Sequence, residues 1–158
     1  GVEMGEHEGQ HRFTIGQRRG VGLALGHRLY VVGKDVGSNT VTLGPREELL
    51  VSGCVVGEAN WLVDTAPADS WSRVLARYRS NGALVPARMR LLAGAESGPS
   101  GRSGAFEVEF ETAQEAVAPG QALVLYDVTD PEVVVGGGWI VSATRLATGR
   151  GASIGEGR

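Results

Sequence analysis

Glycine is the residue that most constrains what this chain can fold into. It occupies 25 of 158 positions, roughly twice its average share in proteins. Each glycine inside a helix costs about 1 kcal/mol relative to alanine, so the composition argues against a bundle of long helices. Short runs rich in valine, leucine and threonine alternate with glycine-containing turns at a spacing of about ten residues. We therefore predict an all-β chain.

The predicted strands divide into two small units. The first spans residues 1–66 and is predicted to be a small β domain. A T-A-P-A-D-S linker at 65–70 leads into the second unit, residues 67–147, which is predicted to be a β-barrel. Residues 148–158 are small and polar, and are predicted to form a disordered tail.

Two segments indicate how the barrel is built. The run A-F-E-V-E-F-E alternates, so Phe106, Val108 and Phe110 should face one side and the glutamates the other. The run V-V-V-G-G-G-W-I-V-S-A-T, residues 133–144, predicts a strand with a glycine-rich bend of the kind that small barrels use at corners.

The charged residues are segregated along the chain. The net charge is only -3, from 15 basic and 18 acidic residues. Residues 9–34 and 70–95 nevertheless contain no acid and carry five bases each. Such segments bind phosphate groups locally in some proteins and form a solvated outer face in others. Composition alone leaves both interpretations open.

Several common kinds of site have no good candidate. Cys54 is the only cysteine, which excludes a disulfide within the chain and favours a reducing, cytoplasmic setting. It lies in an apolar C-V-V run, so we expect a packed and inert thiol. His7 and His11 have a metal-ligand spacing but no evident third ligand, so no metal site is predicted. The chain has no apolar run long enough to suggest a membrane partner.

The loop G-Q-R-R-G-V-G at 16–22 is the most distinctive local motif. It is not a P-loop, because no G-K-[ST] follows, and it lacks the Rossmann glycine pattern. It is either a structural turn or a loop that packs against RNA or a partner domain.

Several ordered motifs closely resemble the region of the bacterial tRNA-specific 2-thiouridylases that follows their catalytic domain. They are G-E-H-E-G-Q-H-R-F-T-I-G-Q-R-R-G-V-G-L (5–23), L-Y-V-V-G-K-D (29–35), N-T-V-T-L-G (39–44), N-W-L (60–62), A-R-Y-R (76–79), A-V-A-P-G-Q-A-L-V-L-Y-D (116–127) and G-G-G-W-I (136–140). The resemblance extends over residues 1–147 and implies a central β domain followed by a C-terminal β-barrel.

The resemblance also implies a function for the whole enzyme. Members make 2-thiouridine at the wobble position of tRNA by ATP-dependent sulfur transfer; an older name is tRNA (5-methylaminomethyl-2-thiouridylate)-methyltransferase. The implied cofactor is ATP with magnesium. The implied partners are tRNA, a persulfide sulfur donor and an N-terminal catalytic domain. In the family the ATP motif and both catalytic cysteines lie upstream of the matched region. We therefore expect no catalytic residue and no cofactor in this chain, and no activity from it alone.

The family's tRNA contacts carry over where the motifs match. They imply tRNA-binding roles for Arg77, Tyr78 and Gln121, with Arg79 or Arg88 at the margin. We expect these residues on one exposed face, with the Gln121 amide presented outward, although strand alternation sets Tyr78 opposite Arg77.

The loop residues Gly16, Gln17, Arg18 and Arg19 are implied to contact RNA or a neighbouring domain. The alternative function is a β-barrel structural or protein-interaction module without RNA affinity of its own.

Overall fold

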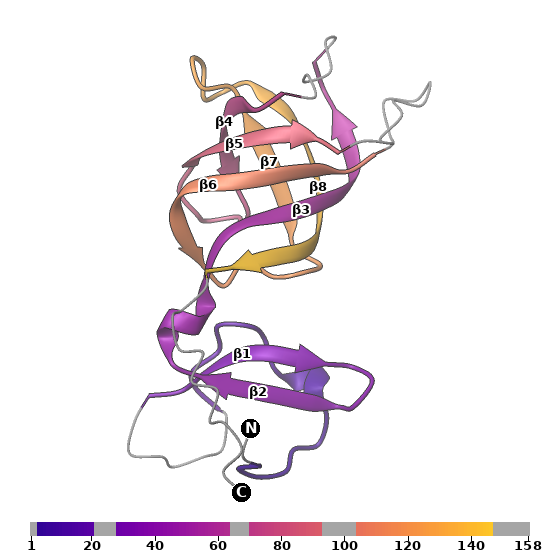
Figure 1. Cartoon of the computed structure of the whole chain (residues 1–158), viewed down its shortest axis with the longest axis vertical. Helices are drawn as coiled ribbons and strands as arrows, with labels where there is room; N and C mark the ends of the chain where they lie inside the picture. Colours follow the sequence, from indigo (N-terminus) through magenta and orange to yellow (C-terminus); the bar gives the residue numbers. More distant parts are fainter. Residues whose placement is uncertain (1–2, 21–27, 64–69, 93–103, 147–158) are drawn as a thin grey trace, which may run out of the picture.

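The computed structural model of the protein describes residues 3–20, 28–63, 70–92 and 104–146. It consists of a closed six-stranded barrel and a separate two-stranded sheet (Figure 1), which confirms the all-β prediction. The expected tail at 148–158 and, apart from Ser70, the expected linker at 65–70 lie outside these residues. Within the described ranges, no helix has the length and apolar character needed to cross a membrane.

The described elements follow one another in the order η1 (Gln10–Arg12), β1 (Tyr30–Asp35), β2 (Thr40–Gly44), η2 (Arg46–Leu49), β3 (Leu50–Trp61), β4 (Ser72–Arg77), β5 (Val85–Leu91), β6 (Phe106–Glu115), β7 (Ala122–Tyr126) and β8 (Val134–Arg145).

The small sheet is an antiparallel hairpin of β1 and β2. Its strands pair from Tyr30 opposite Gly44 to Asp35 opposite Thr40. The Asp35 carboxylate accepts a hydrogen bond of 2.8 Å from the Gly37 amide, which stabilises the connecting turn. Val31 and Val32 of β1 are both buried.

The barrel is antiparallel throughout, with the strand order β3-β6-β5-β4-β7-β8. The sequence interpretation placed the strand now seen as β3 in the first unit and began the barrel at residue 67. In the structure β3 pairs with β6 and β8, so the barrel begins at Leu50, directly after η2. The partners of β3 lie far along the chain, and no local pattern of β3 identifies them.

The barrel core is built from alternating strand positions. Phe106 and Val108 are fully buried and Phe110 nearly so, which confirms the predicted inward face of β6. Met89, Leu123, Leu125 and Ile140 complete the largest buried side chains of the barrel. The ring centroids of Trp61 and Phe106 lie 5.2 Å apart, within the range of favourable aromatic contacts.

The glycine run in which a bend was predicted lies within β8, where this strand passes very close to both neighbours. A Cβ atom on Gly138 would lie 2.4 Å from the Gly57 carbonyl oxygen, and one on Gly137 would lie 2.4 Å from the Leu123 carbonyl oxygen. Because any side chain would collide with backbone there, these two positions need glycine for the barrel to close.

Cys54 gives the barrel a measurable pH dependence. Burial raises the pKa of its thiol from 9.0 to about 12. Above pH 9 the unfolded chain therefore releases a proton that the folded chain keeps, and stability is lost as the pH rises toward 12. We expect the difference in unfolding free energy between the wild type and Cys54→Ala to shrink by about 1 kcal/mol from pH 9 to pH 10, because the unfolded thiol is half ionised at pH 9. Urea titrations at these two pH values measure it, and a difference that does not change with pH would contradict thiol burial.

Candidate nucleic-acid interface

The turn between β6 and β7 forms the junction between the barrel and the small unit. Ala116, Val117 and Ala118 in this turn are buried. Ala116 has a positive φ of 52°, an uncommon conformation for alanine. Its amide donates a 3.2 Å hydrogen bond to the carbonyl oxygen of Leu49, at the end of η2. The turn is therefore tied to the segment that connects the two units.

The predicted loop 14–20 lies against this turn. The Gly16 amide donates to the Val31 carbonyl at 2.9 Å, and the Val31 amide donates to the Gln17 carbonyl at 2.9 Å, which attaches the loop to β1. A Cβ atom on Gly16 would lie only 2.8 Å from the Cβ of Ala116. Gly16 and Gln17 thus have structural contacts, whereas Arg18 and Arg19 are exposed.

Ion pairs and hydrogen bonds add to the junction. Arg46 of η2 lies 2.9 Å from the Glu115 carboxylate at the end of β6. The guanidinium of Arg145, at the end of β8, donates to the carbonyl oxygen of Val32 in β1. These two contacts hold η2 against β6 and β1 against β8.

Gln121 does not present its amide outward as expected. Its Oε1 accepts a 3.1 Å hydrogen bond from the Ala118 amide, and its Nε2 donates to the Ala116 carbonyl at 3.4 Å. The side chain folds back because the turn leaves these two buried backbone groups in need of partners. Gln121 stabilises the junction turn from within.

Arg77 and Tyr78 lie on opposite sides of the barrel wall, as strand alternation requires, so the expectation of one shared exposed face is wrong. Tyr78 packs against the core, with its ring centroid 5.9 Å from that of Phe110. Its hydroxyl donates to the Gln114 Oε1 at 3.2 Å. Burial is the main cause that raises the pKa of Tyr78, and nearby Arg79 partly opposes it.

Arg77 is half-buried on the outer side of β4. Its Cζ lies 5.2 Å from the ring centroid of Tyr126 in β7, a cation–π contact. Its Nε is buried and has no hydrogen-bond partner among the described residues. Sequence reasoning missed Tyr126, although alternation within L-V-L-Y-D places it on the outer face with Val124.

Ion pairs separate the basic residues into two groups. Arg88 and Arg90 on β5 pair with Glu109 and Glu107 on β6: Arg88 Nε lies 2.7 Å from the Glu109 carboxylate, and an Arg90 terminal nitrogen lies 2.7 Å from the Glu107 carboxylate. Both guanidinium groups also lie within 4.7 Å of the Trp71 ring centroid. Arg88 is therefore engaged in a cross-strand ion pair. This makes it a poor candidate for a phosphate contact at the margin of the predicted tRNA site.

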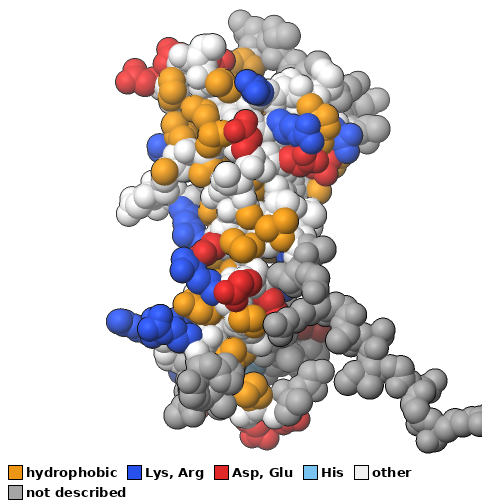
Figure 2. All heavy atoms as spheres, turned by 60° about the vertical axis from the view of Figure 1, so that its left-hand side comes forward, with side chains coloured by type: hydrophobic (Ala, Val, Ile, Leu, Met, Phe, Trp, Pro, Cys, Tyr) orange, Lys and Arg blue, Asp and Glu red, His pale blue; other side chains and the backbone are white. Residues whose placement is uncertain are grey.

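The second group has no acidic partner in the part of the chain that the structure describes. It comprises Arg18, Arg19, Arg28, Lys34, Arg73, Arg77, Arg79 and Arg145. Figure 2 shows basic side chains along one edge of the molecule, from the lower half of the barrel to the small unit, and a separate basic group among acidic side chains near the top. Arg79 also donates to the Glu115 carbonyl at 2.8 Å, beside the junction turn.

His7, one of the two histidines with a metal-ligand spacing, is engaged in other contacts. His7 accepts a 3.1 Å hydrogen bond from the Gly9 amide and packs edge-on against Phe13. Within the described ranges, no three His, Cys, Asp or Glu side chains are grouped closely enough to hold a metal ion.

Comparisons with known proteins divide the chain at the same point as the structure. Residues 1–45 match the tRNA methyl transferase PRC-barrel domain, and residues 51–140 match the aminomethyltransferase beta-barrel domain. The interval between them coincides with η2 and the start of β3.

Curated relatives match nearly the whole chain. Those named tRNA-specific 2-thiouridylase MnmA include proteins from Caulobacter vibrioides, 44% identical over 149 residues, and Geobacter metallireducens, 39% identical over 143 residues. These alignments cover 92% and 90% of this chain but only 36% and 35% of the relatives. The chain thus spans little more than a third of the length of the relatives it matches.

The contact between Gly16 and Ala116 can be tested with a matched pair of glycines. Gly16 and Gly120 have similar positive φ values, 88° and 85°, but a Cβ atom on Gly120 would meet nothing within 4 Å. An alanine should cost about 1–2 kcal/mol at either position for its backbone conformation. Gly16→Ala should cost more, because it also collides with Ala116, and should speed hydrogen exchange of the Val31 amide. Equal unfolding free energies and unchanged Val31 exchange would refute the contact.

Proposed function

The chain belongs to the family of the tRNA-specific 2-thiouridylases, and we propose that it contributes the tRNA-binding β domains of such an enzyme. The observation that carries the proposal is the match of both domain models and of relatives named for this activity along nearly the full chain. In the proposed whole enzyme, 2-thiouridine is made at the wobble position of tRNA by ATP-dependent sulfur transfer.

The distribution of free arginines supports a nucleic-acid partner. Arg18 and Arg19 extend from a loop whose glycine packs against the barrel, and Arg79 lies beside the same junction turn. Guanidinium groups without acidic partners are available to form forked hydrogen bonds to phosphate oxygens. A tRNA backbone lying along the junction would meet arginines from both units.

We assign different roles to the three implied contact residues. The end of β4, which carries Arg77, pairs with β7 just after Gln121, so all three belong to the same end of the barrel. Arg77 has the free donor and is the proposed phosphate contact. Tyr78 and Gln121 hydrogen-bond to the segment 114–118 and would position the turn against which the RNA lies.

We propose that this chain performs no chemistry by itself. Its one cysteine is 1% exposed with a raised pKa, so it is unsuited to carry a persulfide. ATP with magnesium, a persulfide donor and a catalytic domain would then belong to the rest of the enzyme. A cytoplasmic setting fits both the tRNA substrate and the single reduced cysteine.

A second candidate function is a structural or interaction module without RNA affinity. The Arg88–Glu109 and Arg90–Glu107 pairs favour it, because they neutralise two of the five bases in the second basic segment, residues 70–95. The two functions differ in whether the remaining arginines contact phosphate.

A pair of arginine variants separates the two functions. Arg77→Ala and Arg88→Ala remove the same formal charge, but only Arg88 has an acidic partner. We expect Arg77→Ala to weaken tRNA binding by about tenfold or more, the cost of losing a charge-assisted hydrogen bond. It should also reduce the slope of log K against log salt by about 0.7–0.9, equivalent to one phosphate. Arg88→Ala should change both quantities much less.

The measurement is a tRNA titration of each variant at several salt concentrations, with melting curves to show that both remain folded. Equal effects of the two substitutions would mean that Arg77 acts only through its general positive charge, and would contradict its proposed phosphate contact. Absence of any tRNA binding by the wild-type chain would favour the interaction module.

A further inference from the structure

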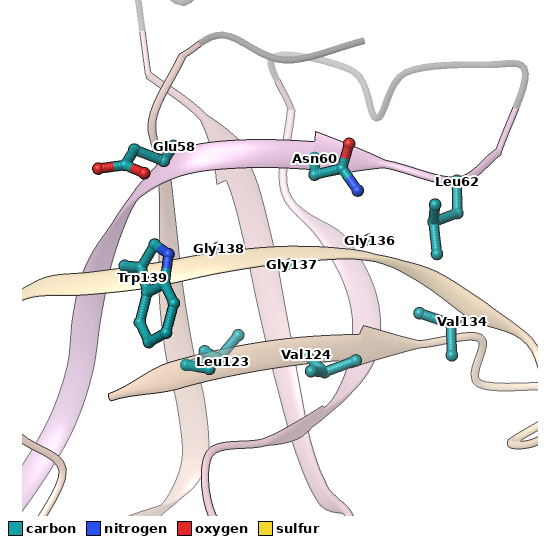
Figure 3. A pocket seen from close by; sticks show the side chains of 11 residues that line it. Glu58, Asn60, Leu62, Leu123, Val124, Val134, Gly136, Gly137, Gly138 and Trp139 are labelled. Carbon is teal, nitrogen blue, oxygen red and sulfur yellow. The ribbon is translucent and has the colours of Figure 1, made fainter. Parts of the chain in front are cut away.

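A groove of about 660 Å³ lies on the outer face of the barrel, where β3, β8 and β7 run side by side (Figure 3). The backbone of Gly136–Gly138 forms part of its lining. Trp139 stands at one end, and Leu62 and Val134 lie at the other. Its volume is within the range of pockets that hold small organic groups. None of the site residues predicted from the sequence lines it.

These lining positions carry no side chain because the barrel requires glycine there. The backbone contacts of Gly137 and Gly138 described above exclude any larger residue. Trp139 beside them is 51% exposed, although a large aromatic side chain on a barrel strand ordinarily gains from burial. Glycines next to a half-exposed indole leave room for a planar group to stack on the indole.

The two long walls of the groove differ in polarity. On the β3 side, Asn60 and Glu58 are exposed and offer an amide and a carboxylate. On the β7 side, Val124 lines the groove and pairs directly with Arg77 of β4. Because β7 lies between β8, which carries Trp139, and β4, which carries Arg77, these two strands lie about 10 Å apart.

Arg77 also supplies an unsatisfied donor near this wall. Its Nε is buried without a partner in the described residues. Its guanidinium lies over Tyr126, which pairs with the groove residue Val134. A buried donor of this kind is costly unless an acceptor arrives, and a phosphate oxygen is a strong acceptor for guanidinium.

From this arrangement we propose that the groove binds one unpaired nucleotide of RNA, with its base stacked on Trp139 and its phosphate directed toward Arg77. Asn60 can hydrogen-bond to the base edge, and the Glu58 carboxylate repels a phosphate from the β3 wall, which sets the direction of the nucleotide. An apolar peptide would use Trp139, Leu62 and Val134 but would leave the Arg77 donor unsatisfied. The inference rests on the proposed tRNA-binding function and extends it to a defined subsite.

The test uses the full chain with a labelled, short single-stranded oligouridylate and with tRNA. Trp139→Leu should weaken binding of the oligonucleotide by about 5- to 150-fold, the range for loss of one base stack. The salt dependence should stay unchanged, because no charge is removed. Trp71→Leu is the matched control, since the Trp71 ring contacts Arg88 and Arg90 of β5, away from the groove, and it should leave affinity unaltered.

The indole N–H signals in the NMR spectrum of the wild-type chain give a second readout. This readout does not depend on whether a groove variant folds. On addition of the oligonucleotide, the Trp139 indole N–H signal should shift and that of Trp71 should not. One outcome separates the two proposals. If tRNA binds and Arg77→Ala weakens this binding, but the Trp139 signal does not shift and Trp139→Leu leaves the affinity unchanged, the groove proposal is wrong and the proposed function stands. If the wild type binds no RNA, both are wrong. A Trp139 signal that responds to an apolar peptide but not to RNA would also overturn the groove proposal.

Discussion

The contact between Gly16 and the β6–β7 turn is the interaction on which the arrangement of this molecule depends. The small hairpin buries little surface of its own, and a two-stranded sheet is only marginally stable in water. The hydrogen bonds between Gly16, Gln17 and Val31 fasten the loop to the hairpin, and the Ala116 contact fastens the loop to the barrel. The exposed arginines of the loop thereby acquire a defined position relative to those of the barrel.

Ion pairing, rather than the number of arginines, distinguishes the surfaces of the barrel. Arg88 and Arg90 lie on the β5–β6 face and their charges are matched by glutamates on the neighbouring strand. Arg77 and Arg79 lie at the end of β4, near the junction, without acidic partners in the described residues. Exposed ion pairs contribute little to stability, but they remove guanidinium groups from the set available to phosphate. This leaves the junction side as the proposed RNA surface of a protein with a net negative charge.

Local patterns predicted local features well. The alternation of Phe106, Val108 and Phe110 identified the inner face of β6, and the glycine run marks where β8 passes close to its neighbours. The position of β3 could not be predicted in this way, because its pairing with β6 and β8 depends on strands far away in the sequence. The inward turn of the Gln121 amide was also missed. This amide hydrogen-bonds to the backbone of Ala116 and Ala118, and the need for these bonds arises from how the turn folds.

The central claim is that one surface, formed by both units, binds tRNA. Hydrogen–deuterium exchange of the chain with increasing tRNA tests it directly, read in the loop at residues 14–20 and in the segment at residues 76–82. We predict that both segments become protected together, at the same tRNA concentration, because the junction holds their arginines on one surface. Protection of neither segment, or protection of the two at separate concentrations, would contradict the account.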